Sequence, residues 1–109
     1  MPITLEECFD YSTGATELVS VDFTPYLDSD ELIDAVVSVS EVTTSAITIA
    51  NQVVNTETFE YCGNTAKVGG AVQFTVNCST EGMYRVRVTA NTDSSPVRTP
   101  VVDILLRFI

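Results

Sequence analysis

The chain lacks histidine and tryptophan altogether, and over 109 residues it has only five basic side chains against fifteen acidic ones. Histidine is the usual general acid or base near neutral pH and a frequent metal ligand, so its absence removes the commonest catalytic group. No glycine loop fits a phosphate cradle, because "VGGAVQF" opens a predicted strand and not a helix. We therefore expect no enzymatic activity, no cofactor and no bound metal.

Asp28, Asp30 and Glu31 form the densest group of acids in the chain. Two alternatives to a plain solvated turn stay open there: a carboxylate pair working as acid and base, or a calcium ion held by hard oxygen ligands. Because "DSDE" lacks the rest of a calcium-loop signature, we interpret it as a solvated turn.

The formal net charge of −10 disfavours two classes of partner. Such a charge repels phosphate backbones and anionic lipid surfaces, so we expect no nucleic-acid binding and no membrane binding. No run of eighteen apolar residues is present, and "MPITLEECFDYSTG" lacks the basic and apolar regions of a secretory signal. We expect the three cysteines, Cys8, Cys62 and Cys78, to stay thiols in a reducing cytosol, with Cys62–Cys78 pairing left open.

The charges are unevenly spread along the chain. Residues 1–66 carry twelve acids and no base, whereas residues 67–109 carry three acids and five bases, giving −12 and +2. A solvated surface explains this pattern; the alternative is that regions of opposite sign dock neighbours in a fixed orientation.

Apolar and polar residues alternate along much of the chain, which is typical of half-buried β-strands. The clearest example is 71–78, with Val72, Phe74, Val76 and Cys78 directed inward. In 32–40 we expect Ile33, Ala35, Val37 and Val39 on the core side, with a helix over "SDELIDAVVSV" as the alternative. The seven expected strands are 18–23, 32–40, 46–50, 53–61, 71–78, 84–90 and 101–109.

This pattern predicts one all-β domain. Seven short strands separated by turns indicate two packed antiparallel sheets, with a closed barrel as the alternative. Residues 1–17 show no clean period, so we expect them to form an extended N-terminal arm outside a β-sandwich domain of residues 18–109.

Tyr84 stands at the start of a strand in "EGMYRVRV". In immunoglobulin-type sandwiches a tyrosine near the start of the penultimate strand bonds backward to the chain and fixes the corner between the sheets. Tyr84 fits that role, with Gly82 supplying the turn, Val86 replacing the disulfide cysteine and Phe74 in the core. A simple inward aromatic is the alternative.

Three stretches together resemble a group of small phage immunoglobulin-like virion proteins. They are "VDFTPYLDSDELIDAVVSVS", "ITIANQVVN" and "GGAVQFTVNCSTEGMYRVRVTANTDSSPVRTPVVDILLRFI", which span about residues 20–109. The resemblance implies an immunoglobulin-like fold and a structural role in the virion, most simply as a capsid decoration or cement protein on the outer capsid surface. It implies no catalytic residue.

The partners that the resemblance implies are the major capsid protein or other virion proteins, with self-association as a further option, in a particle assembled in the host cytoplasm. Arg85, Arg87, Leu105 and Ile109 are the expected contact residues. One alternative is a neck, tail or fibre-attachment component. Another is a bacterial carbohydrate-binding or adhesion module, for which the candidate exposed aromatics are Tyr11, Tyr26, Phe59 and Tyr61.

Overall fold

The computed structural model describes residues 3–43, 46–61 and 63–109, and this part of the chain is all-β, as predicted. Its single helical element is a 3-10 turn, η1, at Thr24–Tyr26, and no helix in it is long and apolar enough to cross a membrane. The strands are β1 Ile3–Tyr11, β2 Thr16–Asp22, β3 Ile33–Glu41, β4 Ile47–Val54, β5 Phe59–Tyr61, β6 Asn64–Ala66, β7 Ala71–Cys78, β8 Gly82–Thr92 and β9 Val101–Phe108.

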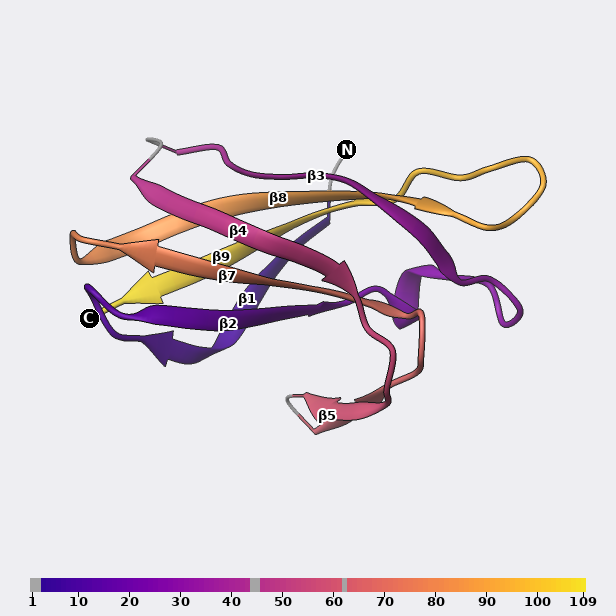
Figure 1. Cartoon of the computed structure of the whole chain (residues 1–109), viewed down its shortest axis with the longest axis horizontal. Helices are drawn as coiled ribbons and strands as arrows, with labels where there is room; N and C mark the ends of the chain where they lie inside the picture. The colour runs from indigo at the N-terminus through magenta and orange to yellow at the C-terminus, as the bar shows by residue number, and fades with distance from the viewer. Residues whose placement is uncertain (1–2, 44–45, 62) are drawn as a thin grey trace.

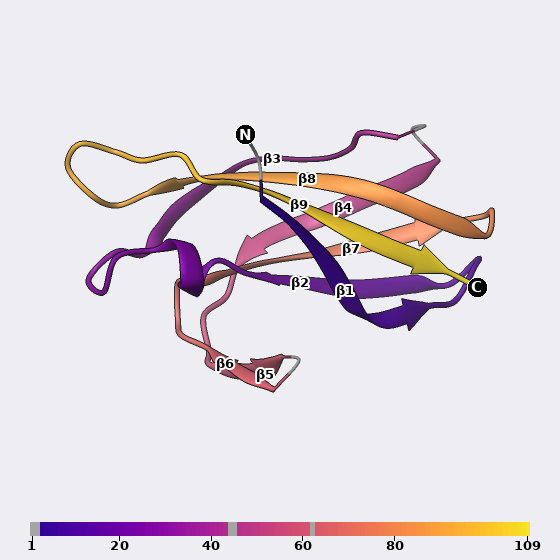
Figure 2. The same ribbon diagram turned by 180° about the vertical axis from the view of Figure 1, so that it is seen from behind.

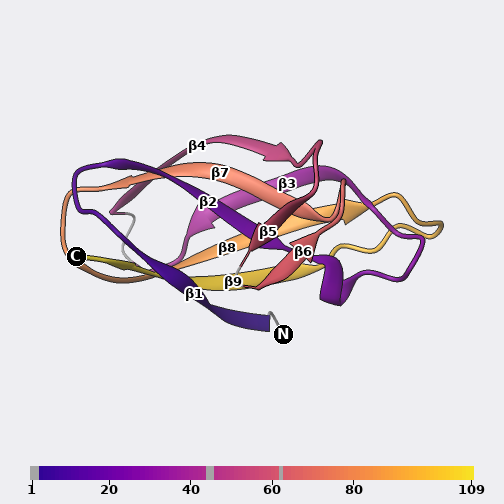
Figure 3. The ribbon, with the colours of Figure 1, turned by 90° about the horizontal axis from the view of Figure 1, so that it is seen from below.

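Two sheets form the body of the molecule. One has the strand order β1-β9-β8-β3 and the other β2-β7-β4, while β5 and β6 form a separate hairpin. Figure 3 shows the two layers, with β4 and β7 above β8 and β9. Figure 1 looks onto the β2-β7-β4 sheet, with the hairpin beyond β2, and Figure 2 shows β1 beside β9 on the other sheet. The pairing is antiparallel throughout, except that β1 runs parallel to β9.

The N-terminal segment belongs to the sheet, which corrects the prediction of an extended arm over residues 1–17. Residues 3–11 pair with the last strand, from Ile3 opposite Val102 to Tyr11 opposite Phe108, and β2 begins at Thr16. The Tyr11 side chain is buried, and its ring lies 5.8 Å from that of Phe108. A register irregularity between Glu6 and Asp10 breaks the period of two, which is why the sequence pattern concealed this strand. Residues 1 and 2 lie outside the described residues.

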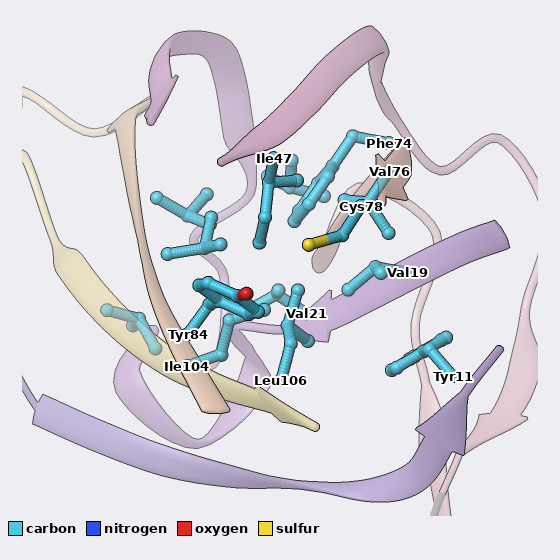
Figure 4. Packing of buried hydrophobic residues seen from close by; sticks show 14 of the residues in the cluster. Tyr11, Val19, Val21, Ile47, Phe74, Val76, Cys78, Tyr84, Ile104 and Leu106 are labelled. Carbon is cyan, nitrogen blue, oxygen red and sulfur yellow. The ribbon is translucent and has the colours of Figure 1, made fainter. Parts of the chain in front are cut away.

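One hydrophobic core lies between the two sheets, and the strands with the cleanest alternation line it. On β2, β7, β8 and β9 the apolar residues at alternating positions are buried, including Phe74, Tyr84 and Val86. Figure 4 shows Phe74 and Val76 of one sheet facing Tyr84 and Leu106 of the other. Apolar side chains from both layers therefore leave water together, which is the main stabilising term of such a fold.

Strand β3 buries a different set of residues from the predicted one. Ile33 is buried and Val36 and Val39 pack against the core, whereas Ala35 and Val37 are exposed. The pairing of β3 with β8 shifts register between Ile33 and Ala35 and again between Val36 and Ser38. Each irregularity changes which side chains face inward, so the buried positions recur every third residue and not every second.

The predicted strand over 53–61 is interrupted at Asn55. This buried side chain donates hydrogen bonds to the carbonyls of Glu57 and Lys67, at 2.9 and 2.8 Å, and accepts one from the Ala71 N–H at 2.9 Å. The chain therefore leaves the sheet after Val54, and β5 pairs with β6 instead. Residues 64–66, which lie between two of the predicted strands, thus form β6.

Candidate binding surfaces

Three connections meet at the end of the molecule away from the C-terminus (Figure 1). We call this the loop end; it comprises residues 23–32, 55–70 and 93–100. The connections are joined by backbone bonds: Phe23 N–H donates to Gly70, and Ile33 N–H to Gly69, both at 2.8 Å. Residues 32 and 93 also bond reciprocally, because the N–H of each donates to an oxygen of the other at 2.9 Å. Segments distant in sequence thus form one surface.

Glu31 is the centre of this end, and its carboxylate is buried although it carries a charge. Its Oε2 accepts a bond from Arg98 Nε at 2.9 Å, while its Oε1 accepts from Arg98 Nη2 and from the Asp28 N–H. These bonds, that of Arg98 first, hold the pKa of Glu31 well below its ordinary value. Arg98 also donates to the Tyr26 carbonyl at 3.0 Å, and Lys67 Nζ donates to the Glu31 carbonyl at 2.9 Å.

These contacts show how the acid cluster of residues 28–31 is arranged. The Glu31 carboxylate faces a guanidinium and not its acidic neighbours, whereas Asp28 and Asp30 are exposed. Among the described residues, no three His, Cys, Asp or Glu side chains come close enough to hold a metal ion. In this turn Glu31 joins two loops through its bonds to Arg98, whereas Asp28 and Asp30 face solvent.

The surface of the loop end is acidic and partly apolar. Leu32, Val68 and Val97 are 37%, 47% and 60% exposed, one on each of the three connections. Asp28 and Asp30 face solvent beside them, while the two cations of this end, Lys67 and Arg98, are bonded to Glu31. Because the loops of this surface are already bonded to one another, they lose less conformational entropy when a partner binds.

Four residues were predicted to contact a partner, and the structure does not bring all four together. Arg85 is exposed on β8, opposite half-buried Leu105 in the pairing of β8 with β9. Arg87 forms an ion pair within the chain: its Nε and Nη2 donate to the two carboxylate oxygens of Asp103 at 2.8 and 3.0 Å. Ile109 is 57% exposed at the end of the chain, where its N–H donates to Tyr11.

Asp103 is a residue that the sequence reasoning missed. It lies in the middle of the apolar run "VVDILL", is 2% exposed, and raises the pKa of Arg87 through their hydrogen bonds. The available signal was an acid inside an apolar strand that pairs with an arginine-bearing strand, since a buried charge needs a partner.

Tyr84 lies at the other end of the core. Its hydroxyl donates to the carbonyl of Thr80 at 2.8 Å, four residues earlier, and its ring packs edge-on against Phe108 at 5.9 Å. The neighbouring Cys78 thiol and burial raise the pKa of Tyr84. Val86 and Phe74 are fully buried, so all three residues hold the core and none offers a binding surface.

Exposed aromatic platforms are scarce among the residues suggested for sugar binding. Tyr11 is buried, which corrects its prediction as exposed, and Tyr26 and Phe59 are half-buried. The Tyr61 side chain lies outside the described side chains.

The outward side of the β2-β7-β4 sheet carries one charged residue among its cross-strand positions, Asp22, where β2 reaches the loop end. The rest of this side is uncharged. We call it the neutral face and define it by these residues of three fully described strands: Thr16, Leu18, Ser20, Thr48, Ala50, Val53, Gln73, Thr75 and Asn77. By contrast, the outward side of the other sheet carries Arg85, Arg87 and Arg107.

No family model matches the sequence, and no curated protein matches it. Among solved structures, the chain is similar to a nucleoside hydrolase-related hypothetical protein from Saccharophagus degradans that is associated with carbohydrate metabolism, with 16% identity and a TM-score of 0.50. The match covers 99% of this chain and 22% of that protein, so the chain spans about a fifth of its length. At this identity the likeness concerns the fold alone.

Proposed function

We propose that this chain is a non-enzymatic, immunoglobulin-like β-sandwich that serves as a structural protein of a phage particle, bound to the outer capsid surface as a decoration protein. The resemblance of residues 20–109 to small phage immunoglobulin-like virion proteins supports the role in the particle, and the strand order supports the immunoglobulin-like fold. In constant-type immunoglobulin sandwiches the second, fourth and fifth strands share one sheet and the third, sixth and seventh the other. Strands β2, β7 and β4 and strands β9, β8 and β3 follow this division, once the β5–β6 hairpin is set aside as an insertion. Strand β1 departs from it, because it pairs with β9, whereas the first strand of a constant-type domain lies in the other sheet. The bond from Tyr84 to Thr80 supports the immunoglobulin-like assignment.

The loop end is the surface that we propose for capsid contact. Its three connections are joined by the bonds of Glu31 to Arg98 and to Lys67, and it combines exposed apolar side chains with exposed acids. This composition fits a partner surface bearing lysine or arginine around an apolar centre. An interface of about 1,000 Å² suffices in a repeated lattice, because many equivalent contacts raise the avidity.

Co-sedimentation of the purified chain with bare capsids tests the proposal. We expect the chain to pellet with capsids, and the exposed loop-end substitution Asp30→Lys to weaken this binding. The matched control is Glu81→Lys, an equal change of charge at an exposed turn on the opposite end; we expect it to leave binding intact. Failure of the unmodified chain to associate with any virion component would overturn the proposal.

Protein quantitation on purified particles separates the two virion positions. A decoration protein is present in many copies per particle, whereas a neck, tail or fibre-attachment component is present in few. A low copy number would favour a neck, tail or fibre-attachment component over a decoration protein, and the structural role in the virion would stand.

A carbohydrate-binding module is the second candidate. The observation that favours it is the fold likeness to part of a protein associated with carbohydrate metabolism. The buried position of Tyr11 weighs against it, because sugar sites use exposed aromatic faces. Binding on a glycan array without capsid association would select this candidate.

A further inference from the structure

The neutral face is unusual in a chain with a net charge of −10. Its nine positions form cross-strand rows, for example Leu18, Thr75 and Ala50 in one row and Ser20, Gln73 and Val53 in the next. Between these two rows β4 has a register irregularity, from Ala50 to Val53. Leu18 and Val53 are 60% and 52% exposed. Protein interfaces are distinguished by depletion of charged residues at their centre, and this face has that property across its whole width.

The polar side chains of this face are already ordered along it. Gln73 Nε2 donates to Ser20 Oγ at 3.1 Å, and Asn77 Nδ2 donates to Thr16 Oγ1 at 3.2 Å. Such cross-strand bonds hold the side chains across the sheet, so less rotamer freedom is left to lose on binding. Ser20 is buried, at 7% exposed, whereas Thr16 and Thr48 are exposed and Gln73 and Asn77 half-buried. The hydroxyls and amides of the latter four residues keep further hydrogen-bonding capacity toward the outside.

We infer that the neutral face is where two copies of this chain pair, sheet against sheet, around a twofold axis. An isologous interface must be complementary to itself. A surface of one charge sign opposes its own copy, whereas hydroxyls and amides both donate and accept, so they can bond to their own kind. Each chain has a net charge of −10, and pairing through the neutral face brings no two charges of the same sign into direct contact.

The sizes of the side chains fit this arrangement. A twofold axis lying in the interface along β7 exchanges the β2 side of one copy with the β4 side of the other. Leu18 of each copy then lies over Ala50 of the other, and Val53 lies over Ser20. In both rows a large side chain meets a small one, which is how facing layers interdigitate at the usual spacing of about 10 Å.

The area of the neutral face sets the expected stability of the dimer. Three strands at about 4.8 Å spacing and eight residues at about 3.3 Å rise give a small patch. The pair therefore belongs to the lower end of interface sizes, below about 1,200 Å² in total, and we expect a dissociation constant in roughly the micromolar range or above. This inference is independent of the capsid proposal, because it concerns the purified chain alone.

Sedimentation velocity over a range of concentrations tests the inference. We expect a reversible monomer–dimer equilibrium that persists at high salt, because no ion pair holds it. Leu18→Lys is expected to leave the chain monomeric at all concentrations tested. Val97→Lys is the matched control, since Val97 is also 60% exposed and the charge change is identical, but it lies at the loop end; it should dimerise like the parent.

A size exchange provides a second, independent readout. Ala50→Leu alone should weaken the dimer at least tenfold by placing two leucines against each other, and the double variant Leu18→Ala with Ala50→Leu should restore it. Circular dichroism and thermal melting of each variant establish that it is folded. A parent chain that stays monomeric, or a dimer that Leu18→Lys leaves intact, would overturn the inference; a dimer that high salt dissociates would do the same.

Discussion

The guanidinium of Arg98 holds both carboxylate oxygens of Glu31, a residue 67 positions earlier in the sequence. The pair joins the β2–β3 connection to the β8–β9 connection, and the backbone carbonyl of Glu31 accepts from Lys67 on the third connection. One buried carboxylate therefore organises all three connections of the loop end. These side-chain bonds add to the backbone bonds that already join the connections, so the loops have less entropy to lose on binding.

The first prediction concerns stability at acid pH. The hydrogen bonds from Arg98 and from Asp28 lower the pKa of Glu31 below its ordinary 4.5. A group with a depressed folded-state pKa contributes stability that is fully present above its unfolded pKa. The contribution of Glu31 should therefore be complete at pH 7 and be lost as the pH falls below about 4.5, through the folded pKa. Thermal melting between pH 7 and pH 2 measures this loss.

Glu31→Gln is the variant that isolates this contribution. Gln keeps the size of the side chain and carries no charge, so the variant should melt several degrees lower at pH 7. The difference between the two proteins should shrink as the pH is lowered below about 4.5, because the unfolded parent then binds a proton at Glu31 that the folded parent does not bind. Melting temperatures that differ by the same amount at every pH would show that Glu31 is not the titrating group.

The second prediction concerns Arg87 and Asp103. Asp103 is 2% exposed, and both its oxygens are bonded to Arg87. Removing only the arginine, in Arg87→Met, leaves an unpaired buried carboxylate, which is the costly arrangement for an ion pair. We expect this variant to be clearly less stable by urea unfolding than the double variant Arg87→Met with Asp103→Leu, in which no charge is buried. A double variant that is less stable than either single one would contradict this ranking.

The sequence predicted strands well where both sheets bury every second residue. Phe74, Val76 and Val86 face the core because their strands are regular and central or nearly so. The exceptions are β1 and β3, at the edges of their sheet. Register irregularities interrupt the pairing of both strands, and on β3 they change which residues are buried. Such irregularities depend on the partner strand, so alternation along a single strand does not reveal them.

The binding surfaces were less predictable than the strands. The pairing of Glu31 with Arg98, and of Arg87 with Asp103, depends on which strands and loops become neighbours, and no local pattern fixes this. The neutral face could have been found by collecting the outward positions of three predicted strands, but only once the order β2-β7-β4 was known. The local sequence pattern therefore predicts the strands, whereas the binding surfaces depend on which strands and loops become neighbours.

The third prediction tests the burial pattern of β3. Val36 packs against the core, whereas its neighbour Val37 is 53% exposed. Val36→Thr places a hydroxyl at the core and should cost about 1 kcal/mol, since buried polar groups without partners are unfavourable. Val37→Thr should change the free energy of unfolding by less than about 0.5 kcal/mol. Equal effects, or a larger effect at Val37, would mean that the strand alternates regularly.

The fourth prediction compares the two sides of the β2-β7-β4 sheet. Phe74 is fully buried on the inner side, whereas Leu18, on the neighbouring strand, is 60% exposed on the outer side. Phe74→Ala removes a large side chain and leaves a cavity, so it should cost about 3–5 kcal/mol, a large part of the stability of a small domain. Leu18→Ala should cost less than about 0.5 kcal/mol when measured on the monomer. Urea unfolding at low protein concentration keeps any pairing of copies out of the comparison, because dimers dissociate on dilution. If Leu18→Ala proved as costly as Phe74→Ala under those conditions, the outer side of the sheet would have to be covered by the chain itself, and it could not serve as a surface for a second copy.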